Sequence, residues 1–129
     1  MIKGSEIYSV HCGNIISRVG TDFVLIEPAI LLAEVSNAVG RNIDLKTARQ
    51  EADTLKNMIA VFMPCNDEFC LRSGLTGAEY DIFSADSLYL QTAIDYHTII
   101  VSLDEEDFVN KIRIKKPPIE IYHVRDFPY

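Results

Sequence analysis

The sequence predicts an α/β domain with a mainly parallel central sheet flanked by helices. Short apolar runs, of which Thr98–Leu103 is the clearest, alternate along the chain with longer segments whose apolar residues recur at helical spacing. Each short run is continuously apolar, which is typical of strands buried on both faces of a parallel sheet. The 129 residues, of which 48% are hydrophobic and 24% charged, suit a single soluble domain with its own core.

The first half of the chain predicts four elements. Apolar residues in Ser5–Val19 recur mostly at helical spacing, and the run Phe23–Ile26 predicts a buried strand. A helix is expected over Glu27–Gly40, since the proline at its second position is tolerated in a first turn. Leu45–Met58 carries an apolar stripe, which predicts a second, amphipathic helix.

The second half continues the alternation of strands and helices. A strand over Ile59–Met63 is expected to stop at a proline, and two short helices should follow with a break at Gly74 and Gly77. Ser84 is a good N-cap for a helix that runs to Tyr96. The two short helices before Ser84 are expected over Asn66–Ser73 and Thr76–Ile82. After Tyr96 we expect the strand Thr98–Leu103, a helix over Glu105–Lys111 and an edge segment over Ile119–Val124.

The charge balance is acidic, with 12 basic and 19 acidic residues and a formal net charge of −7. Nonspecific nucleic-acid binders usually have a basic surface, because lysine and arginine displace counterions from phosphates. An acidic protein can still act on RNA when a divalent ion lies between its carboxylates and a phosphate. Basic residues gather only near the C-terminus, where a solvated segment is expected rather than an RNA contact: Lys111, Arg113, Lys115 and Lys116.

The cysteines and the hydropathy pattern favour a cytoplasmic protein. Cys12, Cys65 and Cys70 are an odd number without zinc-ligand spacing, as expected for thiols in a reducing compartment. No run reaches 18 uncharged apolar residues, so no transmembrane helix and no membrane partner are expected. The opening residues do not have the pattern of a secretory signal.

Three carboxylates are candidates for chemistry. Asp104 directly follows the strand Thr98–Leu103 and is expected at the carboxyl edge of the sheet, where ligands of such sheets gather. Asp86 lies in the first turn of a helix whose next turns are apolar. Glu34 interrupts an otherwise apolar helical segment, where an unpaired charge is costly.

Each of these carboxylates also has an ordinary structural explanation. Asp104 suits the N-cap of the turn that follows it, and a first-turn acid such as Asp86 is favoured by the helix dipole. Glu34 can extend into solvent. Taken together, however, clustered carboxylates supply the oxygen ligands that Mg²⁺ or Mn²⁺ prefers, and metal-bound water is a nucleophile for phosphodiester cleavage.

The segments around these acids resemble the PIN-domain family. Glu34 lies in the run FVLIEPAILLAEVSNAV, which resembles the segment that carries the family's helix glutamate. Ser84–Ala93 resembles the family's aspartate-led helix, and Thr98–Asp104, followed by Phe108, resembles its late strand, with serine or threonine two residues before the aspartate. The similarity spans about residues 5–110, and the order and spacing of the motifs are more specific than any one of them.

The resemblance implies a three-layer fold and a Mg²⁺- or Mn²⁺-dependent single-strand endoribonuclease. Glu34, Asp86 and Asp104 would be its catalytic and metal-site carboxylates, and Ser102 would lie near the substrate phosphate. The resemblance also implies the toxin half of a toxin–antitoxin pair of the VapC-like kind, which is neutralised by a small antitoxin protein and commonly forms a homodimer. The alternative ligands Glu105 and Asp107 lie within one helical turn of Asp104.

One feature of the family is missing from this sequence. PIN domains open with an apolar strand that ends in aspartate, whereas this chain opens with MIKGSEIYSVHCGN and has no aspartate before Asp22. Either the reading frame starts too late, or this is a degraded or repurposed copy. One central strand and one ligand are expected to be absent from the chain as given, and metal binding and catalysis to be weak, because like charges remain without their ion. A second hypothesis is a noncatalytic PIN-derived module that pairs with itself or with an antitoxin, for example through an exposed strand edge.

Overall fold

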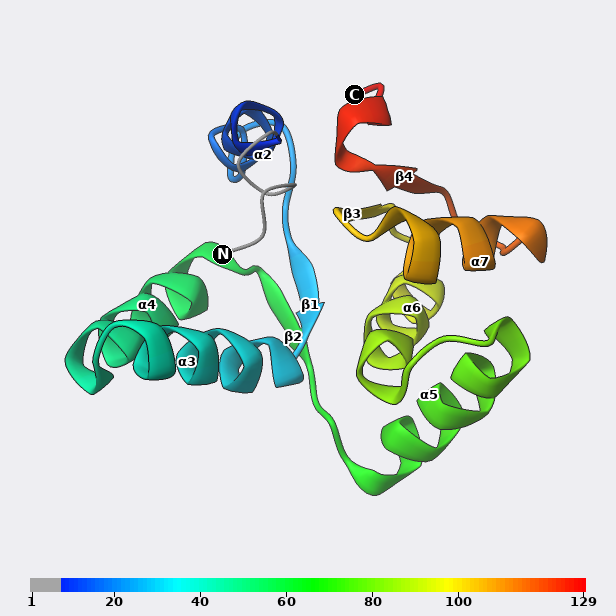
Figure 1. Cartoon of the computed structure of the whole chain (residues 1–129), viewed down its shortest axis with the longest axis horizontal. Coiled ribbons are helices and arrows are strands. Elements are labelled where there is room, and N and C mark those ends of the chain that lie inside the picture. Colours follow the sequence, from blue (N-terminus) through cyan, green and yellow to red (C-terminus); the bar gives the residue numbers. More distant parts are fainter. Residues whose placement is uncertain (1–7) are drawn as a thin grey trace.

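The computed structural model describes residues 8–129, in which short strands alternate with helices (Figure 1). None of the helices in this part of the chain combines the length and the apolarity needed to cross a bilayer. In chain order the elements are α2 (Ser9–Ile16), β1 (Ile26–Pro28), α3 (Ile30–Asn42), α4 (Leu45–Met58), β2 (Val61–Met63), α5 (Asp67–Tyr80), α6 (Ser84–Tyr96), β3 (Ile100–Ser102), η1 (Glu105–Val109), α7 (Asn110–Ile114), β4 (Ile121–His123) and η2 (Val124–Asp126). The first residues of the helix expected over Ser5–Val19 lie outside the described residues, and α2 ends at Ile16, before the expected end at Val19.

The strands pair as two separate two-stranded sheets, and both pairs are parallel. β1 pairs with β2, so that Ile26 lies opposite Val61, and β3 pairs with β4, so that Ile100 lies opposite Ile121. Parallel strands joined through helices confirm the predicted α/β class. Within residues 8–129 the expected central sheet is present as two halves, with β1 at the edge of one half and β3 at the edge of the other.

α3 and α4 form a helical hairpin beside the β1–β2 pair (Figure 1). Asp44 caps α4, because its Oδ1 accepts a hydrogen bond from the Thr47 N–H at 2.6 Å. The helix expected to start at Glu27 is wrong at that end, since Glu27 and Pro28 belong to β1 and α3 begins at Ile30. The strand tolerates proline because the ladder to β2 uses the next N–H along the chain, that of Ala29.

α5 and α6 pack closely because Gly77 has no side chain. A Cβ built at Gly77 would lie 2.6 Å from the Cβ of Ser87, far inside an ordinary carbon–carbon contact. The glycine therefore permits close packing instead of breaking the helix, and the predicted division of α5 into two helices is wrong. Arg72 on α5 also binds α6, through two hydrogen bonds of 2.9 Å to the Asp95 carboxylate.

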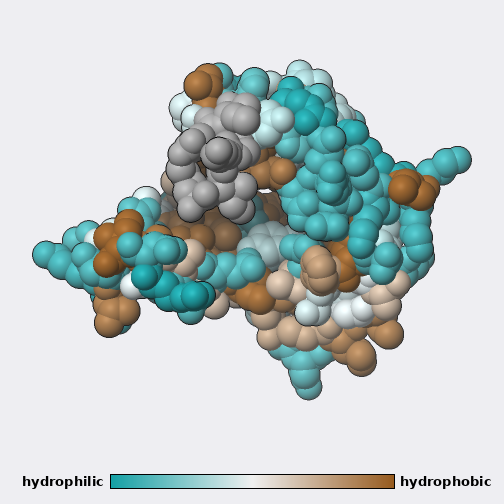
Figure 2. Space-filling view, in the orientation of Figure 1, coloured by the Kyte–Doolittle hydropathy of each residue, from teal (hydrophilic) through white to brown (hydrophobic). Residues whose placement is uncertain are grey.

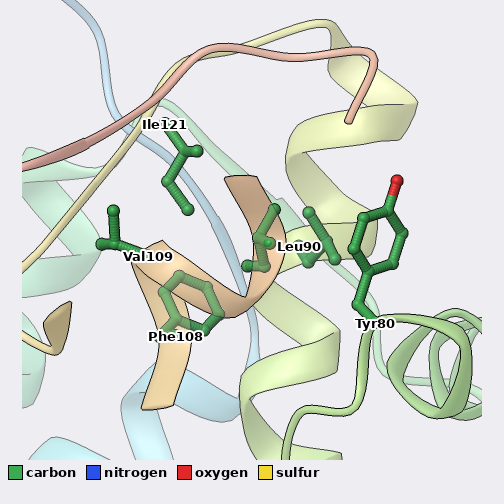
Figure 3. Close-up of a cluster of buried hydrophobic side chains, with 6 residues drawn as sticks. Tyr80, Leu90, Phe108, Val109 and Ile121 are labelled. Carbon is green, nitrogen blue, oxygen red and sulfur yellow. The ribbon is translucent and has the colours of Figure 1, made fainter. Parts of the chain in front are cut away.

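The main hydrophobic cluster lies where α6, η1 and α7 meet β4. Leu90 on α6 is fully buried there, together with Phe108, Val109 and Ile121 (Figure 3). Tyr80, at the end of α5, closes one side of the cluster. These contacts join the C-terminal third of the chain to α6 and so hold β3, which ends at the candidate site, in place.

The basic residues near the C-terminus make contacts within the protein. Lys111 donates a hydrogen bond to the Asp81 carbonyl oxygen at 3.0 Å, and Lys115 donates to that of Glu79, so both lie at the C-terminal end of α5. Cations at a helix C-terminus are favoured by the helix dipole. Arg113 donates to the carbonyl oxygen of Ile121 on β4. These contacts give three of the four basic residues a structural role, which the expectation of a solvated segment did not include.

The strands are less buried than their apolar composition predicts. β3 is a half-buried strand of three residues, and its neighbours Ile99 and Leu103 are 40% and 44% exposed. Val24, inside the run predicted as a buried strand, is 66% exposed and precedes β1. A continuous apolar run is typical of a strand in the middle of a parallel sheet, whereas in the described residues each of these strands is paired along one edge only.

Candidate active site

Asp86 is surrounded by carboxylates from other elements. It lies in the first turn of α6, which begins at Ser84 itself, so Ser84 is not the N-cap that the sequence predicts. Burial is the largest cause that raises the pKa of Asp86, and the nearby carboxylates of Asp104, Glu34 and Asp107 raise it further. Glu34 from α3 and Asp104 from the end of β3 therefore both act on Asp86, although the three residues come from separate elements.

Glu34 reaches this group from the exposed side of α3 and is held by a tyrosine. The Tyr89 hydroxyl on α6 donates a hydrogen bond to the Glu34 Oε1. Burial raises the pKa of Tyr89, and the hydrogen bond and charge of Glu34 raise it further, so the hydroxyl remains a donor at neutral pH. This contact relieves the cost that the sequence predicts for an unpaired charge on an apolar helix.

Asp104 ends the β3 segment and caps the turn that follows. Its Oδ1 accepts a hydrogen bond of 3.0 Å from the Asp107 N–H, which confirms the predicted cap. The Ser102 Oγ accepts a hydrogen bond of 3.0 Å from the Asp104 N–H, so this side chain lies beside the aspartate backbone. The cap fixes the carboxylate at the carboxyl end of β3, where an α/β sheet places its ligands.

The structure separates the two alternative ligands that follow Asp104. The Asp107 carboxylate is one of the charges that raise the pKa of Asp86. Glu105 instead forms an ion pair with Arg125 near the C-terminus. Asp107 therefore belongs to the acidic group, whereas the side chain of Glu105 serves to hold the C-terminal segment.

Glu27, which the sequence pattern places at the start of a helix, is a further acid near the site. It lies in β1, and burial raises its pKa from 4.5 to about 7. Its charge also raises the pKa of Tyr89, and the two residues line the same small cavity. The sequence contains one signal for this position, because Glu27 directly follows the apolar run FVLI, and a strand that continues past this run buries the acid.

The acidic group fits a divalent ion by the type of its side chains. Carboxylate oxygens are the ligands that Mg²⁺ and Mn²⁺ prefer. Within residues 8–129, however, no three acidic, histidine or cysteine side chains converge closely enough to hold an ion as they stand. The carboxylates that raise the pKa of Asp86 therefore lie farther apart than the ligands of a bound ion. They would have to move toward one another to share an ion.

The fold that carries this acidic group is a PIN-like α/β fold. The chain is similar to a chain in the solved structure of VapBC-1 from nontypeable Haemophilus influenzae, with a TM-score of 0.65 and 14% sequence identity. The similarity covers 91% of this chain and 87% of that one, which confirms the predicted fold class. No family model and no curated protein sequence matches this chain.

Proposed function

We propose that this chain is a metal-dependent endoribonuclease of the PIN type. The observation that carries the proposal is that Glu34 on α3 and Asp104 after β3 both lie near enough to Asp86 on α6 for their charges to raise its pKa. Clustered like charges of this kind are stabilised by a divalent cation. Mg²⁺ or Mn²⁺, held by these carboxylates, would supply an activated water and stabilise the charge on the leaving oxygen.

The remaining residues of the site have supporting roles in this proposal. Tyr89 orients Glu34 through its hydrogen bond, and Asp107 adds a fourth negative charge beside Asp86. Ser102 would donate its hydroxyl proton to a substrate phosphate, because its oxygen already accepts the Asp104 N–H. The acidic surface would then bind RNA through the metal ion instead of through a basic patch.

We further propose that the chain is the toxin component of a toxin–antitoxin pair in the cytoplasm, with RNA as substrate and a small antitoxin as partner. The likeness to VapBC-1 supports this assignment at the level of the fold. Free thiols at Cys12, Cys65 and Cys70 agree with a reducing compartment. α5 exposes Leu71 and Leu75 by 66% and 65%, and Figure 2 shows apolar surface over this helix, which supports a protein interface such as a homodimer.

The direct test is cleavage of a labelled, mostly single-stranded RNA by the purified chain with Mg²⁺, with Mn²⁺ and with EDTA. We expect cutting that requires the metal and falls about 100-fold or more in Asp86→Asn. Asp53→Asn is the matched control, because Asp53 is an exposed acid on α4, away from the site. Its activity should equal that of the wild type.

The second candidate function is a noncatalytic, PIN-derived binding or dimerisation module. The observation in its favour is that no three ligand side chains converge within residues 8–129. Equal background cutting by the wild type and by Asp86→Asn under all three conditions would reject the nuclease and favour this module.

A further inference from the structure

Cys65 and Cys70 lie on the two sides of the N-cap of α5. The cap is Asn66, whose side-chain oxygen accepts a hydrogen bond of 2.9 Å from the Phe69 N–H. Cys65 therefore directly precedes the cap, and Cys70 is the fourth residue of the helix. Residues at these two positions commonly pack against each other, in the contact called a hydrophobic staple. The local backbone thus brings two cysteines together.

The Cys70 thiol points back across the cap toward Cys65. Its S–H donates to the Cys65 carbonyl oxygen, with 3.6 Å between the sulfur and the oxygen. Because a carbonyl oxygen lies about 2.4 Å from its own Cα, the Cys70 sulfur is within about 6 Å of the Cys65 Cα. In a disulfide each sulfur lies beside the Cβ of the other cysteine, and a rotation of the Cys65 side chain toward α5 would bring the two sulfurs together.

The two thiols differ in their exposure. Cys70 is exposed, whereas Cys65 is half-buried and its S–H donates to the Met63 carbonyl oxygen at 3.9 Å. Cys70 also lines a cavity of about 220 Å³ together with Ile30 and Ser84, which gives a small molecule access to its sulfur. A pair with one accessible and one shielded thiol is suited to stepwise thiol–disulfide exchange.

We propose that Cys65 and Cys70 form a redox-active dithiol whose substrate is a low-molecular-weight disulfide such as oxidised glutathione. The Cys70 thiol loses its proton to water, and its sulfur attacks one sulfur of the small disulfide. A mixed disulfide forms, and one small thiolate leaves and takes up a proton. The Cys65 sulfur, after losing its own proton, attacks the Cys70 sulfur and releases the second small thiol. The protein loses two electrons, and the small disulfide is reduced to two thiols.

The bond would tie the segment that leaves β2 to the first turns of α5, which packs against the helix that carries Asp86 (Figure 1). The reduced pair is the form expected in a reducing compartment, and the disulfide would form when the ratio of disulfide to thiol rises. Because the folded chain already brings the two side chains together, folding and oxidation of this pair favour each other.

The test incubates the whole chain in buffers of oxidised and reduced glutathione, followed by alkylation of the remaining thiols and mass spectrometry. We expect the wild type to lose two thiols and the mass of two hydrogen atoms. Cleavage between the two cysteines, at Asp67 or Glu68, should give two peptides that the bond holds together. Cys12→Ser is the matched control, since Cys12 lies on another element, α2, and this variant should form the same bond.

Two further comparisons test the order of attack and the geometry. Cys65→Ser should accumulate the mixed disulfide on Cys70, because this variant lacks the thiol that resolves it. In the wild type, the equilibrium constant for the internal disulfide should be about tenfold or more higher in buffer than in concentrated urea.

Several outcomes would overturn the proposal. These are the absence of an internal disulfide in the most oxidising buffer, an internal disulfide that includes Cys12, or equal equilibrium constants in the folded and the unfolded chain. Equal labelling of all three cysteines by glutathione in the wild type would overturn it too. None of these readouts depends on RNA cleavage, so the proposal can fail while the proposed nuclease activity stands.

Discussion

At the scale of single residues, the chemistry of the site depends on how neighbouring carboxylates act on Asp86. Burial alone would raise its pKa, and the charges of Asp104, Glu34 and Asp107 add to that effect. The two contributions can be separated by neutralising one neighbour while the fold is kept. Asp104→Asn suits this purpose, because asparagine is as good an N-cap as aspartate.

We predict that Asp104→Asn lowers the pKa of Asp86 but leaves it above the ordinary value for aspartate. The like charge is removed, whereas the burial that is the larger cause remains. Carbon-13 NMR of the side-chain carboxyl during a pH titration measures this directly. Asp53→Asn should leave the titration of Asp86 unchanged, and an unchanged pKa in Asp104→Asn as well would show that the two carboxylates are not coupled.

At the scale of elements, the contact between α5 and α6 decides where Asp86 lies. The contact depends on Gly77 and on the hydrogen bonds between Arg72, which lies more than one turn earlier on α5, and Asp95. Gly74, another glycine of the same helix, provides a comparison, because a Cβ added there would have no atom within 4 Å. The two positions share a helix and differ in what their side chains would meet.

We predict that Gly77→Ala destabilises the protein by about 1–3 kcal/mol, because the new methyl group overlaps Ser87 and forces α6 away. Gly74→Ala should instead be neutral or stabilising by up to about 1 kcal/mol, since alanine is the better helix former. Urea denaturation followed by circular dichroism measures both values. Equal effects of the two substitutions would mean that α5 and α6 do not pack as described.

At the scale of the whole molecule, a groove between the two sheets couples stability to pH. Glu27 lines it, and the folded state raises the pKa of this carboxyl from 4.5 to about 7. The folded protein therefore binds the Glu27 proton more tightly than the unfolded chain does. The corresponding stability is fully present below pH 4.5 and is lost as the pH rises through about 7.

We predict that Glu27→Gln stabilises the protein at pH 8 by on the order of 2 kcal/mol and has little effect near pH 4.5. Free energies of unfolding from urea titrations across this range give, for each protein, the slope of stability against pH. Glu51→Gln, at an exposed position on α4, is the control and should keep the wild-type slope. A wild-type slope in Glu27→Gln would show that this carboxyl titrates normally in the folded state.

The order of the elements was readable from the sequence because it depends on local patterns, whereas the site residues came from a family resemblance and stay a prediction. Apolar periodicity predicted the helix Leu45–Met58 within its observed bounds, and Asp104 was recognisable as a cap. The same reasoning failed at Gly77, where the reason for glycine is a neighbouring helix distant in sequence. It failed at Glu27 too, because the proline that follows it suits either a helix start or the end of a strand.

By itself, the sequence determined the α/β class, since composition, spacing and capping act over a few residues, whereas the roles of Glu34, Asp86 and Asp104 stay a prediction. Only the tertiary structure decided that Asp107, and not Glu105, joins Asp86, and that Tyr89 holds Glu34. It alone divided the sheet into two pairs with a groove between them. These outcomes depend on which segments meet in space. A pattern of residues along the chain does not show which strands pair with each other.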